Sequence, residues 1–127
     1  MAENLKKILI IDDQEDILDF TSLVLKEYGH FEVICANSGM DGIDKAAKYL
    51  PDLILLDTWM PDIDGHEICH KLKNSKKTSH IKIAMFTAAV TEKEKKKSLE
   101  NLADAFIEKP FAPDELIKKI NEILKMI

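Results

Sequence analysis

Four short apolar runs in this sequence lead into residues whose side chains can do chemistry: Asp12 and Asp13, Asp57, Thr87, and Lys109. Three carboxylates that share a site repel one another and need a cation, and carboxylate oxygens with room for water suit Mg²⁺ or Mn²⁺. Asp57 could then attack a phosphoryl group and form an acyl phosphate. Lys109 and the Thr87 hydroxyl could stabilise the other oxygens of that group. These residue types therefore predict metal-assisted phosphoryl transfer, provided that the four runs end at one place.

The runs are typical of buried strands, because each is short and carries several consecutive apolar residues. Segments with helical periodicity separate them. We expect strands at 7–11, 31–36, 53–57, 81–86 and 104–108, and helices at 17–29, 38–50, 64–72, 91–102 and 113–127. This alternation predicts an α/β fold, with a five-stranded parallel sheet covered by five helices on both faces. Parallel strands bring their carboxyl ends to one rim, which is where such sheets bind ligands.

The predicted helix at 91–102 is mostly Glu and Lys. Leu99 and Leu102 are almost its only large apolar side chains, so we expect them to anchor it to the rest of the domain. A helix with so few apolar anchors is a candidate for movement. Its lysines could form a nucleic-acid patch, but the interleaved glutamates favour a solvated helix face.

Composition and charge limit the number of domains and the kinds of partner that we expect. The chain has 127 residues, 46% of them hydrophobic, and a net charge of −5. We therefore expect a single domain over 1–127 without an output domain, and no nonspecific nucleic-acid binding. The absence of a long apolar run and of a signal-like N-terminal segment predicts no contact with a membrane and a cytoplasmic location. Cys35 and Cys69 are expected to be reduced residues in or near the core.

The chain closely resembles the receiver domain of two-component response regulators, in particular the stand-alone, CheY-like chemotaxis type. The resemblance covers essentially the whole chain. The motifs that carry it are Ile11-Asp12-Asp13, Leu56-Asp57-Thr58-Trp59-Met60-Pro61-Asp62-Ile63-Asp64-Gly65, Thr87-Ala88 and Lys109-Pro110-Phe111. It implies a flavodoxin/CheY-like fold with strand order 2-1-3-4-5.

The resemblance also implies a phosphoacceptor site. Asp57 would take a phosphoryl group from the phosphohistidine of a sensor histidine kinase. A metal ion would be held by Asp12 or Asp13, by Asp57 and by the backbone carbonyl of Trp59. A cis peptide before Pro110 would orient Lys109, and the sequence shows that this is an X-Pro bond. A protein of this kind is a signalling domain and not an enzyme, although it promotes its own phosphorylation and dephosphorylation.

In the family, phosphorylation draws the Thr87 hydroxyl inward and an aromatic residue on the fifth strand follows. Phe106 holds that position and has no hydroxyl group, so a switch based on packing is expected. The face made by the fourth helix, fifth strand and fifth helix would then bind a motor switch, a relay protein or another effector, or a second copy in a weak homodimer. Trp59 is bulky and Ala89 is small and neutral. In the family these two positions influence how fast the acyl phosphate is hydrolysed, so the resemblance implies slow self-dephosphorylation.

Other classes of function compete with this interpretation. His66 to His70 matches the HExxH pattern of zinc proteases, but Ile68, Cys69 and Leu72 define the buried face, so we expect both histidines on the surface. A haloacid-dehalogenase-type phosphatase needs a second Asp where Trp59 stands. A flavin-binding flavodoxin would need a phosphate-binding loop after the first strand. Asp12 and Asp13 stand there, and their carboxylates would repel a bare phosphate. A degenerate receiver that only binds partners is disfavoured because every site residue is present.

Overall fold

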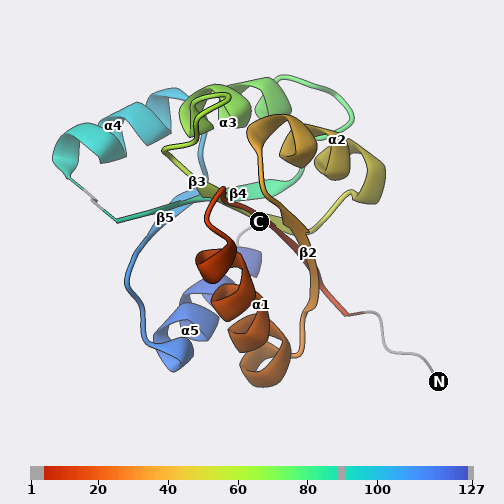
Figure 1. Cartoon of the computed structure of the whole chain (residues 1–127). Helices are drawn as coiled ribbons and strands as arrows, with labels where there is room; N and C mark the ends of the chain where they lie inside the picture. The colour runs from red at the N-terminus through yellow and green to blue at the C-terminus, as the bar shows by residue number, and fades with distance from the viewer. Residues whose placement is uncertain (1–4, 89–90, 126–127) are drawn as a thin grey trace.

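The computed structural model describes residues 5–88 and 91–125 of the chain (Figure 1). The strands are β1 (Lys7–Ile11), β2 (Glu32–Ala36), β3 (Leu53–Asp57), β4 (Lys82–Thr87) and β5 (Ala105–Glu108). The helices are α1 (Glu15–Gly29), α2 (Gly39–Tyr49), α3 (Gly65–Lys73), α4 (Glu92–Glu100) and α5 (Pro113–Leu124). All strand pairs are parallel and their order is β2-β1-β3-β4-β5, so the predicted fold and strand order are confirmed.

The sheet separates two layers of helices. Helices α1 and α5 cover one face, and α2, α3 and α4 cover the other (Figure 1). Side chains of β3 alternate between the two layers: Leu53 and Leu55 join the cluster beneath α1 and α5, while Ile54 and Leu56 join the cluster on the opposite face. Every residue of β3 is buried, and Asp57 is therefore presented at the rim by a strand that cannot shift without disturbing both cores.

Side-chain caps define the start of three helices. The Ser38 hydroxyl accepts a hydrogen bond from the Asp41 N–H, and the Thr91 hydroxyl accepts one from the Glu94 N–H. The Asp64 carboxylate accepts one from the His66 N–H. These caps fix the points at which the chain leaves the rim and enters α2, α4 and α3.

The predicted anchoring of α4 is wrong. Leu99 and Leu102 are exposed, at 64% and 47%, and Ser98 is the buried residue of this helix. The physical reason is the orientation of α4, which turns Ser98 toward α3 and Leu99 toward solvent, while Leu102 lies beyond the end of the helix.

Two further observations concern the cysteine thiols and the length of the helices. Cys35 and Cys69 are both free thiols, as predicted. Burial raises the pKa of the Cys69 thiol to about 12, which makes it unreactive. Within the described ranges, no helix is both long and apolar enough to cross a membrane.

Candidate functional site

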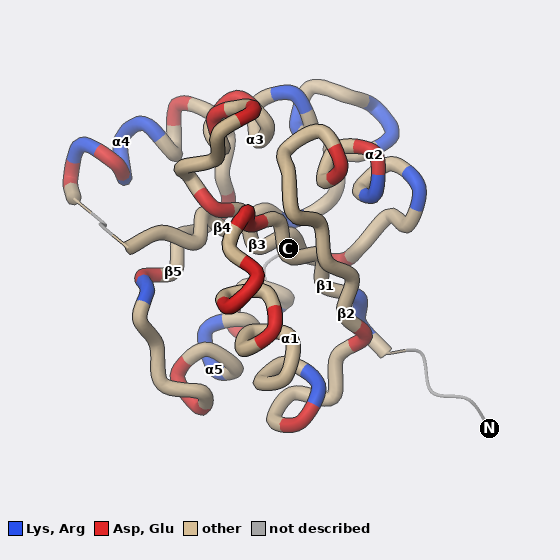
Figure 2. Tube along the Cα trace, viewed as in Figure 1, with Lys and Arg blue, Asp and Glu red and all other residues tan. Residues whose placement is uncertain are grey.

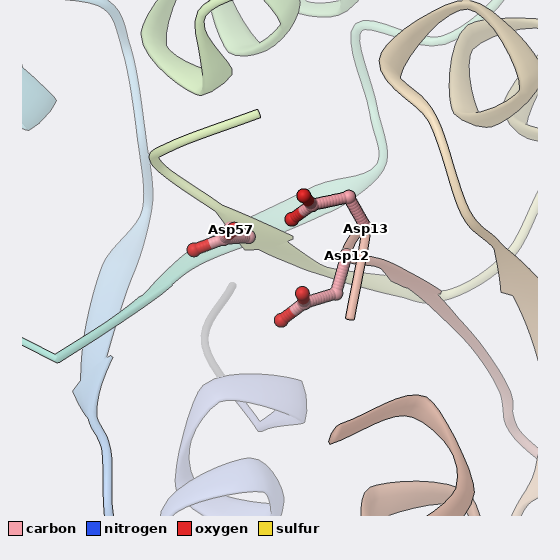
Figure 3. Close-up of side chains that lie close together, drawn as sticks. All are labelled: Asp12, Asp13 and Asp57. Atoms are coloured by element: carbon pink, nitrogen blue, oxygen red, sulfur yellow. The ribbon is translucent and has the colours of Figure 1, made fainter. Parts of the chain in front are cut away.

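Three carboxylates meet at the rim of the sheet, as the sequence predicts. Asp12 and Asp13 follow β1, Asp57 ends β3, and the three side chains lie close together in Figure 3. One oxygen from each carboxylate lies within 4.8 Å of the others. Asp12 and Asp57 are buried, whereas Asp13 is exposed. Acidic positions also continue from the end of β1 into the start of α1 (Figure 2), so the rim is negatively charged.

Lys109 lies within reach of two of these carboxylates. Its Nζ donates a hydrogen bond to Asp12 Oδ2 at 2.7 Å and lies 3.5 Å from Asp57 Oδ1. Its backbone N–H donates to the carbonyl oxygen of Thr87 at 2.8 Å, which joins the end of β5 to the end of β4. The Lys109–Pro110 peptide is cis, as expected. The structure therefore brings Lys109 to the acidic cluster from a position 52 residues after Asp57.

Burial raises the pKa of Asp57 above its ordinary value. The Lys109 ammonium lowers it and the Asp12 carboxylate raises it, and burial outweighs the ammonium. The Trp59 N–H also donates a hydrogen bond to Asp57, and the Gln14 N–H donates one to Asp12. Three carboxylates set against one ammonium leave an excess of negative charge. Oxygen donors with this charge fit a hard divalent cation.

Thr87 and Phe106 occupy the neighbouring strands. Asp57 is paired in register with Phe86, so Thr87 lies one residue beyond the level of Asp57. Strand alternation places Thr87 on the sheet face of Met85, and Phe106 is the register partner of Met85. Phe106 is half-buried and packs on the apolar cluster of that face. Thr87 and Phe106 are thus on the same side of the sheet, the side covered by α2, α3 and α4.

Two sets of hydrogen bonds anchor the loop from β3 to α3. The first joins the two ends of the loop, where the Gly65 N–H donates to the carbonyl oxygen of Thr58 at 3.0 Å. Gly65 is required there, because a Cβ at this position would overlap the Asp57 carbonyl oxygen and lie 2.9 Å from Thr58 Cα. The second lies within the loop, where the Asp62 carboxylate accepts hydrogen bonds from the Gly39 and Met40 N–H groups, both at 3.0 Å.

The role of Asp62 is not predicted from the sequence. Its bonds to the first N–H groups of α2 lower its pKa and hold the loop against that helix. The available signal was the general preference of Asp for helix N-termini, which does not say which helix the side chain will reach. Between the two anchors, Trp59 is 65% exposed, and its carbonyl group lies in a loop that the protein already holds in place. Ala89 lies outside the described residues.

The two histidines of the HExxH pattern have different surroundings. His70 is exposed, as predicted, but His66 is only 2% exposed, so its predicted surface position is wrong. Its Nε2 shares a hydrogen bond with Ser98 Oγ at 3.2 Å, because α4 covers the face of α3 that carries it. Among the described residues, only Asp12, Asp13 and Asp57 form a group of three or more His, Cys, Asp or Glu side chains whose ligand atoms all lie within 4.8 Å of one another. This distribution disfavours a zinc site on α3.

The sequence model of the response regulator receiver domain matches residues 8–121. This match covers most of the chain. The chain belongs to the response regulator receiver domain family. Receiver domains are signalling domains, and the acidic rim described above lies at the carboxyl ends of the strands, where this fold binds ligands.

Individual relatives agree with this assignment. The chain is 38% identical over 120 residues to the alkaline phosphatase synthesis transcriptional regulatory protein PhoP of Bacillus subtilis (strain 168), with 94% of this chain but 49% of PhoP covered. It therefore spans about half the length of that relative. A CheY-like receiver domain protein from Methanospirillum hungatei JF-1 has a TM-score of 0.86 at 36% identity, covering 95% of this chain and 94% of its own. The chemotaxis protein CheY4 of Vibrio cholerae has a TM-score of 0.89 at 28% identity, covering 94% and 99%.

Proposed function

We propose that this receiver domain accepts a phosphoryl group on Asp57 from the phosphohistidine of a sensor histidine kinase, in a Mg²⁺-dependent step, and passes the signal to a partner protein. One observation supports this above all others. Three carboxylate groups lie within 4.8 Å of one another, and Lys109 Nζ lies 2.7 Å from Asp12 and 3.5 Å from Asp57. This arrangement supplies a nucleophile, a cation site and a fixed positive charge in one place.

Each residue has a separate role in the proposed step. An Asp57 oxygen bonds to phosphorus while the P–N bond of the phosphohistidine breaks, and the electron pair of that bond stays on the imidazole nitrogen. Asp12, Asp13, Asp57 and the Trp59 carbonyl would hold Mg²⁺ or Mn²⁺, which neutralises charge on the phosphoryl oxygens. Lys109 and the Thr87 hydroxyl stabilise the remaining oxygens. Such transfer needs mostly positioning and charge neutralisation.

The output is proposed to run from Thr87 to Phe106 and then to the face formed by α4, β5 and α5. Lys95 of α4 supports this route, because its Nζ lies 5.5 Å from the centroid of the Phe106 ring. A movement of that ring would therefore also disturb α4. The same face is where we propose that a second copy could bind to give a weak homodimer, the free domain being otherwise a monomer.

The direct partner is proposed to be a protein, and not nucleic acid or a membrane. Similarity to a Vibrio cholerae chemotaxis protein favours a motor-switch or relay partner, whereas similarity to the transcriptional regulatory protein PhoP favours an effector in transcription. Residues 1–127 would form one receiver domain that works in the cytoplasm. Capture of partners with the phosphorylated and unphosphorylated domain would separate the two pathways.

The proposed function is tested with acetyl phosphate as a small phosphodonor. Intact mass should increase by one phosphoryl group when Mg²⁺ is present and should not change when a chelator removes it. Trp59 is the only tryptophan of the chain, so its fluorescence should report first the addition of Mg²⁺ and then that of the phosphodonor. A mass increase that persists in full in the chelator would contradict the metal dependence.

Trp59→Asn is expected to shorten the lifetime of the phosphorylated domain several-fold. The exposed Trp59 side chain stands two residues after Asp57, where its bulk can obstruct the water that hydrolyses the acyl phosphate. Decay of the phosphorylated mass after removal of the phosphodonor measures this lifetime. Trp59→Phe is the control that keeps an aromatic ring and should decay at nearly the wild-type rate. An unchanged lifetime in Trp59→Asn would exclude this role for Trp59.

A further inference from the structure

Helix α4 is held by polar contacts. All of its residues are described, and Ser98 alone is buried. Its apolar residue Leu99 is 64% exposed, and charged positions run along the helix (Figure 2). Figure 1 shows α4 beside α3 on the same face of the sheet. The contact between these two helices must therefore be explained by polar groups.

These polar groups converge on one histidine of α3. His66 Nε2 lies 3.2 Å from Ser98 Oγ, in a shared hydrogen bond, and 3.6 Å from Glu94 Oε2. His66 Nδ1 lies 3.4 Å from Asp64 Oδ1, and the other Asp64 oxygen lies 3.7 Å from Lys97 Nζ. We call these five residues the α3–α4 seam. Because Ser98 and His66 are both buried, their hydrogen bond is shielded from competition with water.

The seam begins next to the phosphoacceptor. Gly65, the residue before His66, donates its N–H to the Thr58 carbonyl, and it lies so close to the backbone of Asp57 and Thr58 that a Cβ at this position would overlap the Asp57 carbonyl oxygen. The first turn of α3 is therefore fixed to the end of β3. A displacement of the backbone at Asp57 would move Gly65, then His66, and through the hydrogen bond also Ser98 of α4.

We infer that His66 is a positioning residue that couples the backbone at Asp57 to α4, by a route separate from Thr87 and Phe106. The inference rests on the proposed function of Asp57 as phosphoacceptor. It also gives a role to the HExxH sequence, whose first histidine connects two helices and whose second faces solvent. Both routes end at α4, so each would contribute to the position of the proposed output face.

Amide hydrogen exchange of the unphosphorylated domain tests the seam. Ser98→Ala removes the hydroxyl and favours the helix, so faster exchange in α4 could not be attributed to lower helix propensity. We expect exchange in α4 to accelerate roughly two- to tenfold, the effect of one hydrogen bond, with α5 unchanged.

The histidine variants provide a matched comparison. His66→Phe should accelerate exchange in α4 to a similar extent, and His70→Phe, on the exposed side of the same helix, should not. The double variant His66→Phe with Ser98→Ala should resemble either single variant. The seam would be overturned if the effects of the two substitutions on exchange in α4 were additive in the double variant. It would also be overturned if exchange in α4 did not accelerate, or if it accelerated equally throughout the domain.

The coupling is tested on the phosphorylated domain. With acetyl phosphate and Mg²⁺, exchange in wild-type α4 should change, and this change should shrink at least twofold in Ser98→Ala at equal phosphorylated mass. An equal change in both proteins, or none in phosphorylated wild type, would overturn the coupling. If wild type never gains the phosphoryl mass, the proposed function fails, while exchange in the unphosphorylated variants still decides the seam.

Discussion

Asp57→Asn is expected to abolish the gain of phosphoryl mass from acetyl phosphate in the presence of Mg²⁺. The substitution keeps the shape of the side chain and removes the nucleophilic carboxylate, so uptake should fall to background. Asp13→Asn is the comparison, because it removes a proposed metal ligand from the same cluster and leaves the nucleophile in place, so its uptake should be slower but not abolished. Uptake in Asp57→Asn at the wild-type level would show that another residue is the phosphoacceptor.

The same substitution should not destabilise the fold. The pKa of Asp57 is raised in the folded state, chiefly by burial, so the folded protein binds a proton at Asp57 more readily than the unfolded chain does. The ionised carboxylate therefore lowers stability at neutral pH, and stability is regained as the pH falls through the folded pKa. Without metal, Asp57→Asn should have an unfolding midpoint at pH 7 equal to or above that of wild type. The difference should narrow in acid.

Thermal unfolding across pH measures this effect. Asp13 is exposed, so Asp13→Asn relieves repulsion without relieving burial and should stabilise the protein less. A lower midpoint for Asp57→Asn at pH 7 would mean that the ion pair with Lys109 outweighs the burial of Asp57. The expected pattern, in which the functional carboxylate costs stability, is common at sites that hold charge for chemistry.

The acidic cluster could be predicted from sequence because it depends on topology alone. Parallel strands that end in Asp12, Asp57 and Lys109 must bring these residues to one rim, whatever the details of packing. The structure places Lys109 against both carboxylates accordingly. Asp62 was missed because its bonds to the start of α2 join segments that are distant in the sequence, and no local pattern encodes that contact.

The contact between α3 and α4 could not be predicted for a different reason. Ile68, Cys69 and Leu72 correctly identify the face of α3 that packs on the sheet, and all three are buried. A second neighbour covers another face of the same helix and buries His66 there. The periodicity of apolar residues in a helix predicts which face packs on the sheet. It does not show that a polar face of the same helix is covered, as α4 covers that face of α3. The same limit explains why Leu99 was expected to be buried while Ser98 is the residue that packs.

Lys109→Met is expected to change two measurements in opposite directions. Methionine keeps the length and much of the volume of lysine and removes the ammonium group that lies 2.7 Å from Asp12. That ammonium competes with a bound cation for the carboxylates, so Mg²⁺ should bind roughly tenfold more tightly, as measured by Trp59 fluorescence. The rate of phosphorylation should fall roughly 10²- to 10³-fold, because a donor that stabilises the phosphoryl oxygens is lost.

A gain in Mg²⁺ affinity together with a loss of phosphorylation rate would exclude general damage to the site as the cause. A misfolded or loosened site would weaken Mg²⁺ binding and phosphorylation together, whereas loss of a specific charge strengthens one and weakens the other. The pH dependence of phosphorylation is a third measurement. Lys109 lowers the pKa of Asp57, so replacing Lys109 by methionine should move the acid limb of the phosphorylation profile to higher pH. Lys109→Arg keeps the positive charge and should retain wild-type Mg²⁺ affinity. If Lys109→Met phosphorylates at the wild-type rate, the ammonium serves only to hold the carboxylates together before the metal binds.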